Sequence, residues 1–310
     1  ATQMLVECGD YVVYEAGADA IPNVLHEIGR LREITFRGTG EGTGRSIDLD
    51  KFDKYYRHIF VWNRVRSEIV GAYRLGQTDI IRRFFGENGL FTNTLFEFDR
   101  ALLDRMQPAL EMGRSFVRPE YQKAFQPLLL LWKGIGAFIV RNPQYKTLFG
   151  PVSITGDYQP LSRRLIASFL RHHHFLSEEA QAVRPRHPFG YPQADLRAMD
   201  LDDLSTLIAD IEGGRRCIPV LLKHYLKLGG KIVGFNVDPK FSNVLDGLIV
   251  VDLTQTGRKV LQRYMGIEGA ATFLAYHGIT SGREAQPTRS PDHALHGIHH
   301  NTRFGRSTAT

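Results

Sequence analysis

The chain alternates short apolar runs, typical of buried strands, with segments whose apolar residues recur every three or four positions, as in amphipathic helices. Helices are predicted at residues 21–36, 127–141 and 219–228, with shorter helices between 79 and 106 and between 257 and 277. Strands are predicted at residues 11–15, 58–65, 68–76, 109–117, 147–154, 231–236 and 248–253. This order of elements predicts an α+β fold with a mixed sheet.

The predicted elements place residues 1–280 in one domain, in which residues 155–216 carry helices and Pro/His-rich loops and are expected to be an insertion. Residues 281–310 have few large apolar side chains, so we expect a disordered tail. The glycine-rich run at 38–44 is expected to be a flexible connector. The chain begins with Ala1 instead of methionine, which suggests a segment of a longer protein.

Composition excludes several classes of protein. The 310 residues are 43% hydrophobic and 23% charged, which argues against a disordered or fibrous chain. Lys and Arg number 39 against 33 Asp and Glu, and the net charge of +6 favours an acidic partner such as a carrier protein, an anionic lipid surface or nucleic acid. Two cysteines, Cys8 and Cys217, exclude a disulfide scaffold. No stretch approaches the ~18 apolar residues of a membrane span.

Charged residues occupy several positions whose pattern predicts a buried side chain. Arg32 projects from the apolar face of the first helix, Arg74 interrupts an apolar strand, and Glu111 and Arg114 lie inside the strand ALEMGRSFV. Because an unpaired buried charge costs several kcal/mol, these groups need partners or a ligand. Two interpretations are open. The charged residues form either a structural salt-bridge network, for instance Glu111 with Arg32 or Arg74, or a polar binding site. Gly113 predicts a bulge in the strand.

The remaining polar features carry less information. No G-x-G-x-x-G, P-loop or G-x-S-x-G motif is present. Three consecutive histidines at 172–174 cannot all face one ion, so we expect no metal site. Asp48 and Asp50 are expected to be solvated loop acids, and Asp238 and Asp246 are expected to hold the late hairpin together.

Five short blocks, in order, resemble one family. They are LREITF at 31–36, DKFD at 50–53, GAYRL at 71–75, EMGRSFVRP at 111–119, and GFNVDP at 234–239 with LD at 245–246. The chain resembles the GNAT-type N-acyltransferases that make lyso-ornithine and related amino-acid lipids, sometimes labelled hemolysin-like, and more distantly the acyl-homoserine-lactone synthases. The resemblance covers about residues 10–280.

The resemblance implies a GNAT fold, in which a mixed central sheet has helices on both faces and its central strands splay apart to admit an acyl thioester. The implied reaction transfers a 3-hydroxy fatty acyl group to the amine of an amino acid such as ornithine, the first step of amino-acid-lipid synthesis. Another acceptor (glycine, serine, lysine or homoserine) and a non-enzymatic, membrane-lytic protein are the alternatives. The amine must lose a proton, and the tetrahedral oxyanion needs a hydrogen-bond donor.

The resemblance also implies roles for particular residues. Glu111, supported by Asp53, is expected to relay the proton or orient the amine, and Arg114 completes the catalytic group. A backbone N–H of the bulged strand is expected to hold the oxyanion. The residues expected to bind substrate are Arg32, Arg74, Phe36, Ser115, Phe116 and Val117.

The expected acyl donor is acyl carrier protein. GNAT enzymes that bind coenzyme A follow the central strand with [RQ]-x-x-G-x-[GA], whereas residues 122–127 read QKAFQP, with Phe and Pro in place of glycines. Arg118 or Lys123 is expected to meet the phosphodiester of the carrier's pantetheine arm, and acyl-CoA is the alternative donor. We expect no permanent cofactor and no nucleic-acid partner. The expected location is cytoplasmic, with or without peripheral contact with the inner face of the membrane.

Overall fold

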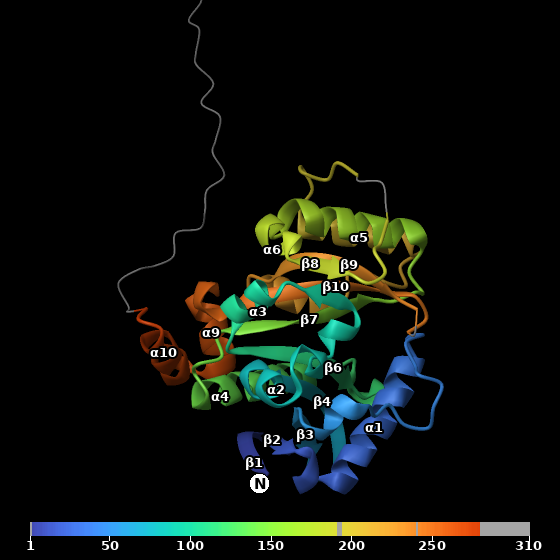
Figure 1. Cartoon of the computed structure of the whole chain (residues 1–310). Coiled ribbons are helices and arrows are strands. Elements are labelled where there is room, and N and C mark those ends of the chain that lie inside the picture. Colours follow the sequence, from blue (N-terminus) through green and yellow to red (C-terminus); the bar gives the residue numbers. More distant parts are fainter. Residues whose placement is uncertain (1, 191–193, 240, 280–310) are drawn as a thin grey trace, which may run out of the picture. The chain divides into compact units, whose positions relative to one another are not determined.

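The computed structural model describes residues 2–190, 194–239 and 241–279, and the expected tail at 281–310 lies outside them. Eight strands form one sheet in the order β1-β2-β3-β4-β6-β7-β10-β9 (Figure 1). Their bounds are β1 Gln3–Cys8, β2 Tyr11–Gly17, β3 Arg57–Asn63, β4 Glu68–Gln77, β6 Ala109–Val117, β7 Thr147–Ile154, β9 Lys231–Asp238 and β10 Val244–Asp252. Neighbouring strands are antiparallel except β6 and β7, which are parallel, so the predicted mixed sheet is confirmed.

Helices follow most of the strands. Their bounds are α1 Pro22–Arg37, α2 Thr78–Phe85, α3 Arg100–Met106, α4 Gln126–Arg141, α5 Pro160–His173, α6 Ser177–Gln181, α7 Leu201–Ile211, α8 Val220–Lys227, α9 Arg258–Met265 and α10 Ile267–Tyr276. Two short strands, β5 Phe96–Phe98 and β8 Val183–Pro185, form a separate two-stranded sheet. The carboxylate of Asp99 accepts a hydrogen bond from the Ala101 backbone N–H at 2.8 Å and so caps the start of α3.

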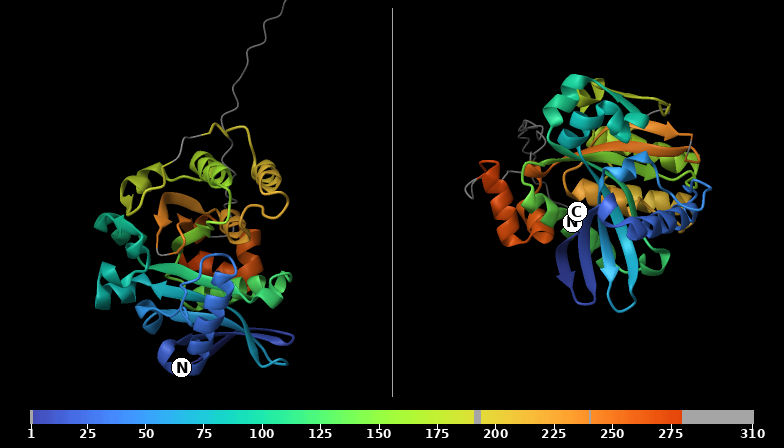
Figure 2. Two further views of the ribbon diagram at one scale, coloured as in Figure 1. Left: turned by 90° about the vertical axis from the view of Figure 1, so that its right-hand side faces the viewer. Right: turned by 60° about the horizontal axis from the view of Figure 1, so that its bottom comes forward.

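The first half of the sheet is covered on both faces, because successive side chains of a strand point to opposite sides. Phe60 and Ala72 pack with apolar side chains of α1. Their neighbours Ile59 and Tyr73 pack in the larger core, which includes α4. In Figure 2, α9 and α10 lie together beside α4, which they contact. The helices on both faces are those expected of a GNAT fold.

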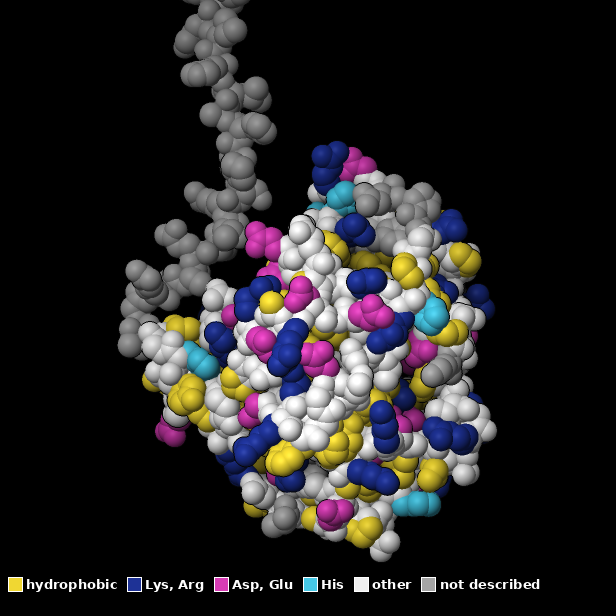
Figure 3. Space-filling model, in the orientation of Figure 1, with side chains coloured by type: hydrophobic (Ala, Val, Ile, Leu, Met, Phe, Trp, Pro, Cys, Tyr) yellow, Lys and Arg dark blue, Asp and Glu magenta, His cyan; other side chains and the backbone are white. Residues whose placement is uncertain are grey.

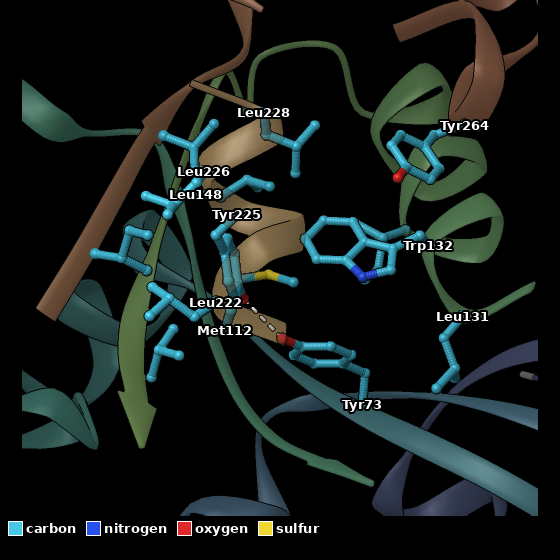
Figure 4. Packing of buried hydrophobic residues seen from close by; sticks show 14 of the residues in the cluster. Tyr73, Met112, Leu131, Trp132, Leu148, Leu222, Tyr225, Leu226, Leu228 and Tyr264 are labelled. Atoms are coloured by element: carbon cyan, nitrogen blue, oxygen red, sulfur yellow. Dashed lines mark hydrogen bonds between the residues drawn. The ribbon is translucent and has the colours of Figure 1, made fainter. Parts of the chain in front are cut away.

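The segment from Leu128 to Val140, the most apolar of the chain, forms most of α4 and packs under the sheet. Figure 4 shows Trp132 of α4 facing Tyr225 of α8, with ring centroids 5.2 Å apart. The hydroxyl of Tyr225 lies 2.7 Å from that of Tyr73 on β4, so this hydrogen bond joins α8 to the sheet. Among the described residues, no helix has the length and apolar character needed to cross a bilayer.

The two parallel strands β6 and β7 separate along their length. They pair at only three positions, from Ala109 opposite Thr147 to Glu111 opposite Phe149. Just beyond, Gly150 is so close to β6 that an added Cβ would lie 2.1 Å from the Met112 carbonyl oxygen. After this point the strands no longer pair, which leaves a gap in the middle of the sheet.

Candidate active site

A cavity of about 710 Å³ occupies the gap between β6 and β7. Residues 113–117 of β6 line one side and residues 151–153 of β7 line the other. The end of α1, the loop at 122–125, the start of α8 and the β9–β10 hairpin complete the wall. Four residues expected to bind substrate line this cavity: Phe36, Ser115, Phe116 and Val117.

The predicted bulge lies in β6 at the edge of the cavity. Ala72 of β4 pairs with Phe116 and Arg74 pairs with Gly113, so Tyr73 faces both Arg114 and Ser115. Arg114 has φ of 51°, a left-handed conformation that is uncommon for residues other than glycine. A bulge leaves one residue outside the regular ladder, so backbone groups of this stretch are directed away from β4. Such strained backbone occurs often at functional sites.

Arg32 and Arg74 are ion-paired to aspartates beside the cavity. Arg32 Nη2 donates to Asp53 Oδ1 at 2.7 Å, and Arg74 Nη1 lies 2.8 Å from Asp50 Oδ1 and 3.2 Å from Asp53 Oδ1. The network therefore pairs the two arginines with Asp53 and Asp50, and not with Glu111. Asp53 is fixed by a capping box, in which its Oδ2 accepts the Asp50 backbone N–H at 2.8 Å.

The pKa directions favour the ionised forms of Asp53, Arg32 and Arg74. Burial alone raises the pKa of Asp53, but Arg74 and Arg32 hold it below its usual value. Burial lowers the pKa of Arg32 to about 10, which still leaves the guanidinium protonated at neutral pH. The pKa of Arg74 is raised because Asp53 and Asp50 more than offset the effect of its burial.

Arg114 connects the network to the cavity. Its Nε lies 3.3 Å from Asp48 Oδ2, and its guanidinium lies 4.4 Å from the ring centroid of Phe241. Arg114 lines the cavity, whereas Arg32, Arg74 and Asp53 lie behind it in the packed interior. The expectation that Asp48 is a solvated loop acid was wrong. Its side chain is 1% exposed and pairs with Arg114, and its backbone N–H donates to the Gly29 carbonyl of α1 at 2.9 Å.

Glu111 is fully buried and does not line the cavity. Its carboxylate accepts hydrogen bonds from the Tyr56 hydroxyl and from the backbone N–H groups of Phe91, at 3.1 Å, and Thr92. Burial raises its pKa above the usual value. Because Phe91 does line the cavity, Glu111 holds one of the cavity's walls in place.

Replacing Glu111 with Gln is expected to lower the free energy of unfolding by about 1–3 kcal/mol. In one orientation the amide turns its NH₂ group toward the Thr92 backbone N–H and leaves this buried donor unsatisfied. In the other it faces the Tyr56 hydroxyl and the Phe91 N–H, which keeps only its hydrogen bond to the Tyr56 oxygen at 3.0 Å. Urea unfolding measures the change. Glu97→Gln is the control, because the Glu97 side chain is 48% exposed on β5. Equal stability of the two variants would contradict the role given to Glu111.

Three carboxylates of the cavity wall are functional candidates that sequence reasoning missed: Glu41, Asp238 and Asp246. Asp246 lies on β10, where its Oδ1 accepts a hydrogen bond from Ser153 Oγ of β7 at 3.1 Å. Burial, together with Asp238, raises the pKa of Asp246 to about 8, and burial raises that of Glu41 to about 7.

Glu41 reaches the cavity because the glycine-rich run at 38–44 is folded back on α1. Its backbone N–H bonds to the Phe36 carbonyl at 2.7 Å, and the buried Glu33 accepts the backbone N–H groups of Thr43 and Gly44 at 2.9 and 3.0 Å. The expected flexible connector is thus pinned by hydrogen bonds. Glu41 is the only charged residue in this run, which is the signal that could have identified it.

The two residues expected to meet the carrier differ in their surroundings. Arg118 lies outside the cavity lining and is paired with Glu68 at 2.6 Å and Glu120 at 3.0 Å. Lys123 lines the cavity mouth, is exposed, and makes no hydrogen bond or ion pair with the part of the chain that the structure describes. Of the two, Lys123 is the residue available to an incoming ligand.

The chain is similar to known acyltransferases. A family model described as "Acetyltransferase (GNAT) domain" matches residues 31–133, which include α1, the bulged strand β6 and the start of α4. The fold and this match define an acyltransferase of the GNAT class. A solved structure, the AHL synthase LasI, is similar with a TM-score of 0.43 at 9% identity, over 81% of this chain and 94% of its own.

Two curated relatives show the family. A glycine N(alpha)-acyltransferase of Bacteroides thetaiotaomicron is 35% identical over 253 residues, 74% of each chain. An L-ornithine N(alpha)-acyltransferase of Agrobacterium fabrum is 30% identical over 261 residues, 81% of this chain and 83% of the relative. The chain therefore belongs to the family of GNAT N-acyltransferases that contains these two enzymes, and it is itself an acyltransferase.

Proposed function

We propose that this enzyme transfers a 3-hydroxy fatty acyl group from acyl carrier protein to the α-amine of an amino acid such as ornithine, the first step in making an amino-acid lipid. The observation that carries the proposal is the cavity between β6 and β7, which combines apolar side chains with a guanidinium and carboxylates. The apolar part suits a fatty chain, and the charged part suits a zwitterionic amino acid. The names of the two relatives support an amino-acid acceptor.

The proposal gives each part of the reaction a position in the cavity. The thioester carbonyl lies at the bulge of β6, where a backbone N–H between Arg114 and Phe116 stabilises the oxyanion. The guanidinium of Arg114 pairs with the α-carboxylate of the amino acid, because its planar fork matches a carboxylate. Arg32 and Arg74 pair with Asp53, and Arg74 and Asp53 hold Asp50 in place. Asp50 and Asp48 in turn pair with Arg114 and so position it.

The mouth of the cavity suits a carrier protein. Phe125 and Val220 line it and are 53% and 60% exposed, so the cavity lining includes apolar side chains that a partner could cover. Lys123 lies two residues before Phe125, and the guanidinium of Arg263 lies 5.2 Å from the Phe125 ring centroid. An exposed apolar pair with basic neighbours fits an acidic protein that delivers a pantetheine arm.

The net positive charge of the chain does not make the face shown in Figure 3 uniformly basic. On the face shown in Figure 3, Lys and Arg side chains are interspersed with Asp and Glu. The proposed docking site for the carrier therefore depends on Lys123 and Arg263, and not on the charge of this whole face. Peripheral contact with membrane lipid, where the acylated product would leave, remains part of the proposal.

The proposal is tested by incubating purified enzyme with 3-hydroxypalmitoyl carrier protein or the corresponding acyl-CoA, and with ornithine, glycine, serine, lysine or homoserine. Mass spectrometry is expected to detect an N-acylated amino acid from the carrier protein, with acyl-CoA a poorer donor. Equal use of acyl-CoA would overturn the carrier assignment, and absence of any N-acylated amino acid would overturn the proposed function.

Lys123→Glu is expected to raise the KM for the acyl carrier protein about tenfold, because the new carboxylate repels an acidic partner. The KM for a short acyl-pantetheine donor, which lacks the carrier protein, is expected to stay unchanged. Lys146→Glu is the matched control, since Lys146 is exposed and lies next to the start of β7, away from the cavity lining. The carrier assignment fails if both lysine variants behave alike.

A further inference from the structure

Two carboxylates of the cavity wall, Glu41 and Asp246, form no ion pair within the described residues. Glu41 is 9% exposed, and its Oε1 makes no hydrogen bond with any described residue. Asp246 is hydrogen-bonded to Ser153 but forms no ion pair within the described residues. Arg114, the nearest guanidinium in the lining, is already paired with Asp48 and Asp50.

Burying anionic groups in this way is unfavourable unless a cation compensates them. The pKa of Asp246 is raised by burial and by the neighbouring charges of Asp238 and Glu41, and Arg114 offsets only part of this effect. Since the wall faces the substrate cavity, a cation that belongs to the substrate would remove the penalty. An amino acid brings such a cation in its ammonium group.

We propose that Glu41, Asp238 and Asp246 form the subsite for the ammonium group of the acceptor amino acid, and that Asp246 accepts the proton that this group must lose. The inference rests on the proposed function and adds the acceptor-binding and proton-accepting residues. Asp246 is preferred to Glu111 because it lines the cavity, and because its partner strand β7 borders the gap. Glu111 does not line the cavity, and its carboxylate is already engaged by three hydrogen-bond donors.

The proposed steps are balanced in atoms and charge. The Asp246 carboxylate takes one proton from the ammonium, and the freed lone pair attacks the thioester carbonyl carbon. The C–N bond forms, and the oxyanion collapses with cleavage of the C–S bond. The departing thiolate takes up the second amine proton and becomes a free thiol. The proton on Asp246 goes to water. The net reaction gives an amide, a thiol and one released proton.

The inference predicts a change in pH dependence. Several groups face Asp246: Asp238 of β9 and Glu41 after α1 raise its pKa, and Arg114 of β6 and the hydroxyl of Ser153 of β7 lower it. Because the base must be ionised, kcat/KM for the amino acid is expected to rise with pH up to about 8 in the native enzyme.

Asp246→Asn is expected to lower kcat/KM for the amino acid by about 100-fold or more and to flatten this rise. Glu41→Gln is expected to raise the KM for the amino acid about tenfold, through the loss of one charge-assisted hydrogen bond. Asp252→Asn is the matched control: it makes the same change on the same strand, where Asp252 only caps a turn outside the cavity lining.

Calorimetric titration with L-ornithine and with glycine gives a second readout that needs no acyl transfer. The subsite is supported if either amino acid binds the native enzyme and Asp252→Asn more tightly than it binds Asp246→Asn and Glu41→Gln. This holds even if the native enzyme transfers no acyl group, because that result refutes only the proposed function. The inference is overturned if neither amino acid binds the native enzyme, or if Asp246→Asn keeps the pH profile and affinity of Asp252→Asn.

Discussion

Gly113→Leu is expected to lower the rate of acyl transfer by at least about 100-fold while leaving the melting temperature nearly unchanged. A Cβ added at Gly113 has no heavy atom within 4 Å, and the backbone there is outside the left-handed region, so the protein accepts the side chain without strain. The added side chain enters the cavity directly beside the bulge. It would occupy the place proposed for the thioester carbonyl.

Gly190→Leu is the control for this experiment. Gly190 also has open space around an added Cβ and no left-handed φ, but it does not line the cavity. Initial rates of N-acyl product formation and thermal unfolding are measured for both variants. A Gly113→Leu enzyme with the native rate would show that the reaction takes place elsewhere.

Asp53→Ala is expected to lower the free energy of unfolding by about 3–5 kcal/mol. The substitution removes the carboxylate that lies 2.7 Å from Arg32 and 3.2 Å from Arg74, two guanidinium groups that are each 1% exposed. The guanidinium groups of Arg32 and Arg74 then lose an anionic partner, and water cannot replace it because both groups are buried. Activity is expected to fall as well, since Asp53 also fixes Asp50 through the capping box.

The comparison for Asp53 is Glu27→Ala, which breaks an exposed ion pair with Arg30 and is expected to cost at most about 1 kcal/mol. Because the pKa of Asp53 is lowered in the folded state, its stabilising contribution is present above the unfolded pKa of about 4 and is lost as the pH falls below it. Urea unfolding at pH 7 and at pH 3 measures both effects. Similar losses for the two variants at pH 7 would contradict the buried network.

The order of the main elements could be predicted because their apolar patterns are strong. The structure places β6 and β7 at Ala109–Val117 and Thr147–Ile154, the ranges that the apolar runs predict. The edge strand β1 was missed because most of its side chains are at least partly exposed, so it has no apolar run. The strands β5 and β8 have three residues each, too few to show a period.

The candidate site could be predicted only in part. Arg32, Arg74 and Arg114 could be found because a charge within an apolar pattern is visible in the sequence. Asp246 carries the same signal, but the strand was predicted to begin at residue 248, whereas β10 begins at Val244 and includes it. Glu41 comes from a loop whose position depends on hydrogen bonds to Glu33, which no local pattern reveals.

The central claim is that acyl transfer takes place in the gap between β6 and β7. The most direct measurement is a crystal structure of the enzyme with a bound N-acyl amino acid. The account predicts the acyl chain in this gap and the amide oxygen about 3 Å from a backbone N–H between Arg114 and Phe116. A product bound outside the gap, with no contact to the bulge, would contradict it.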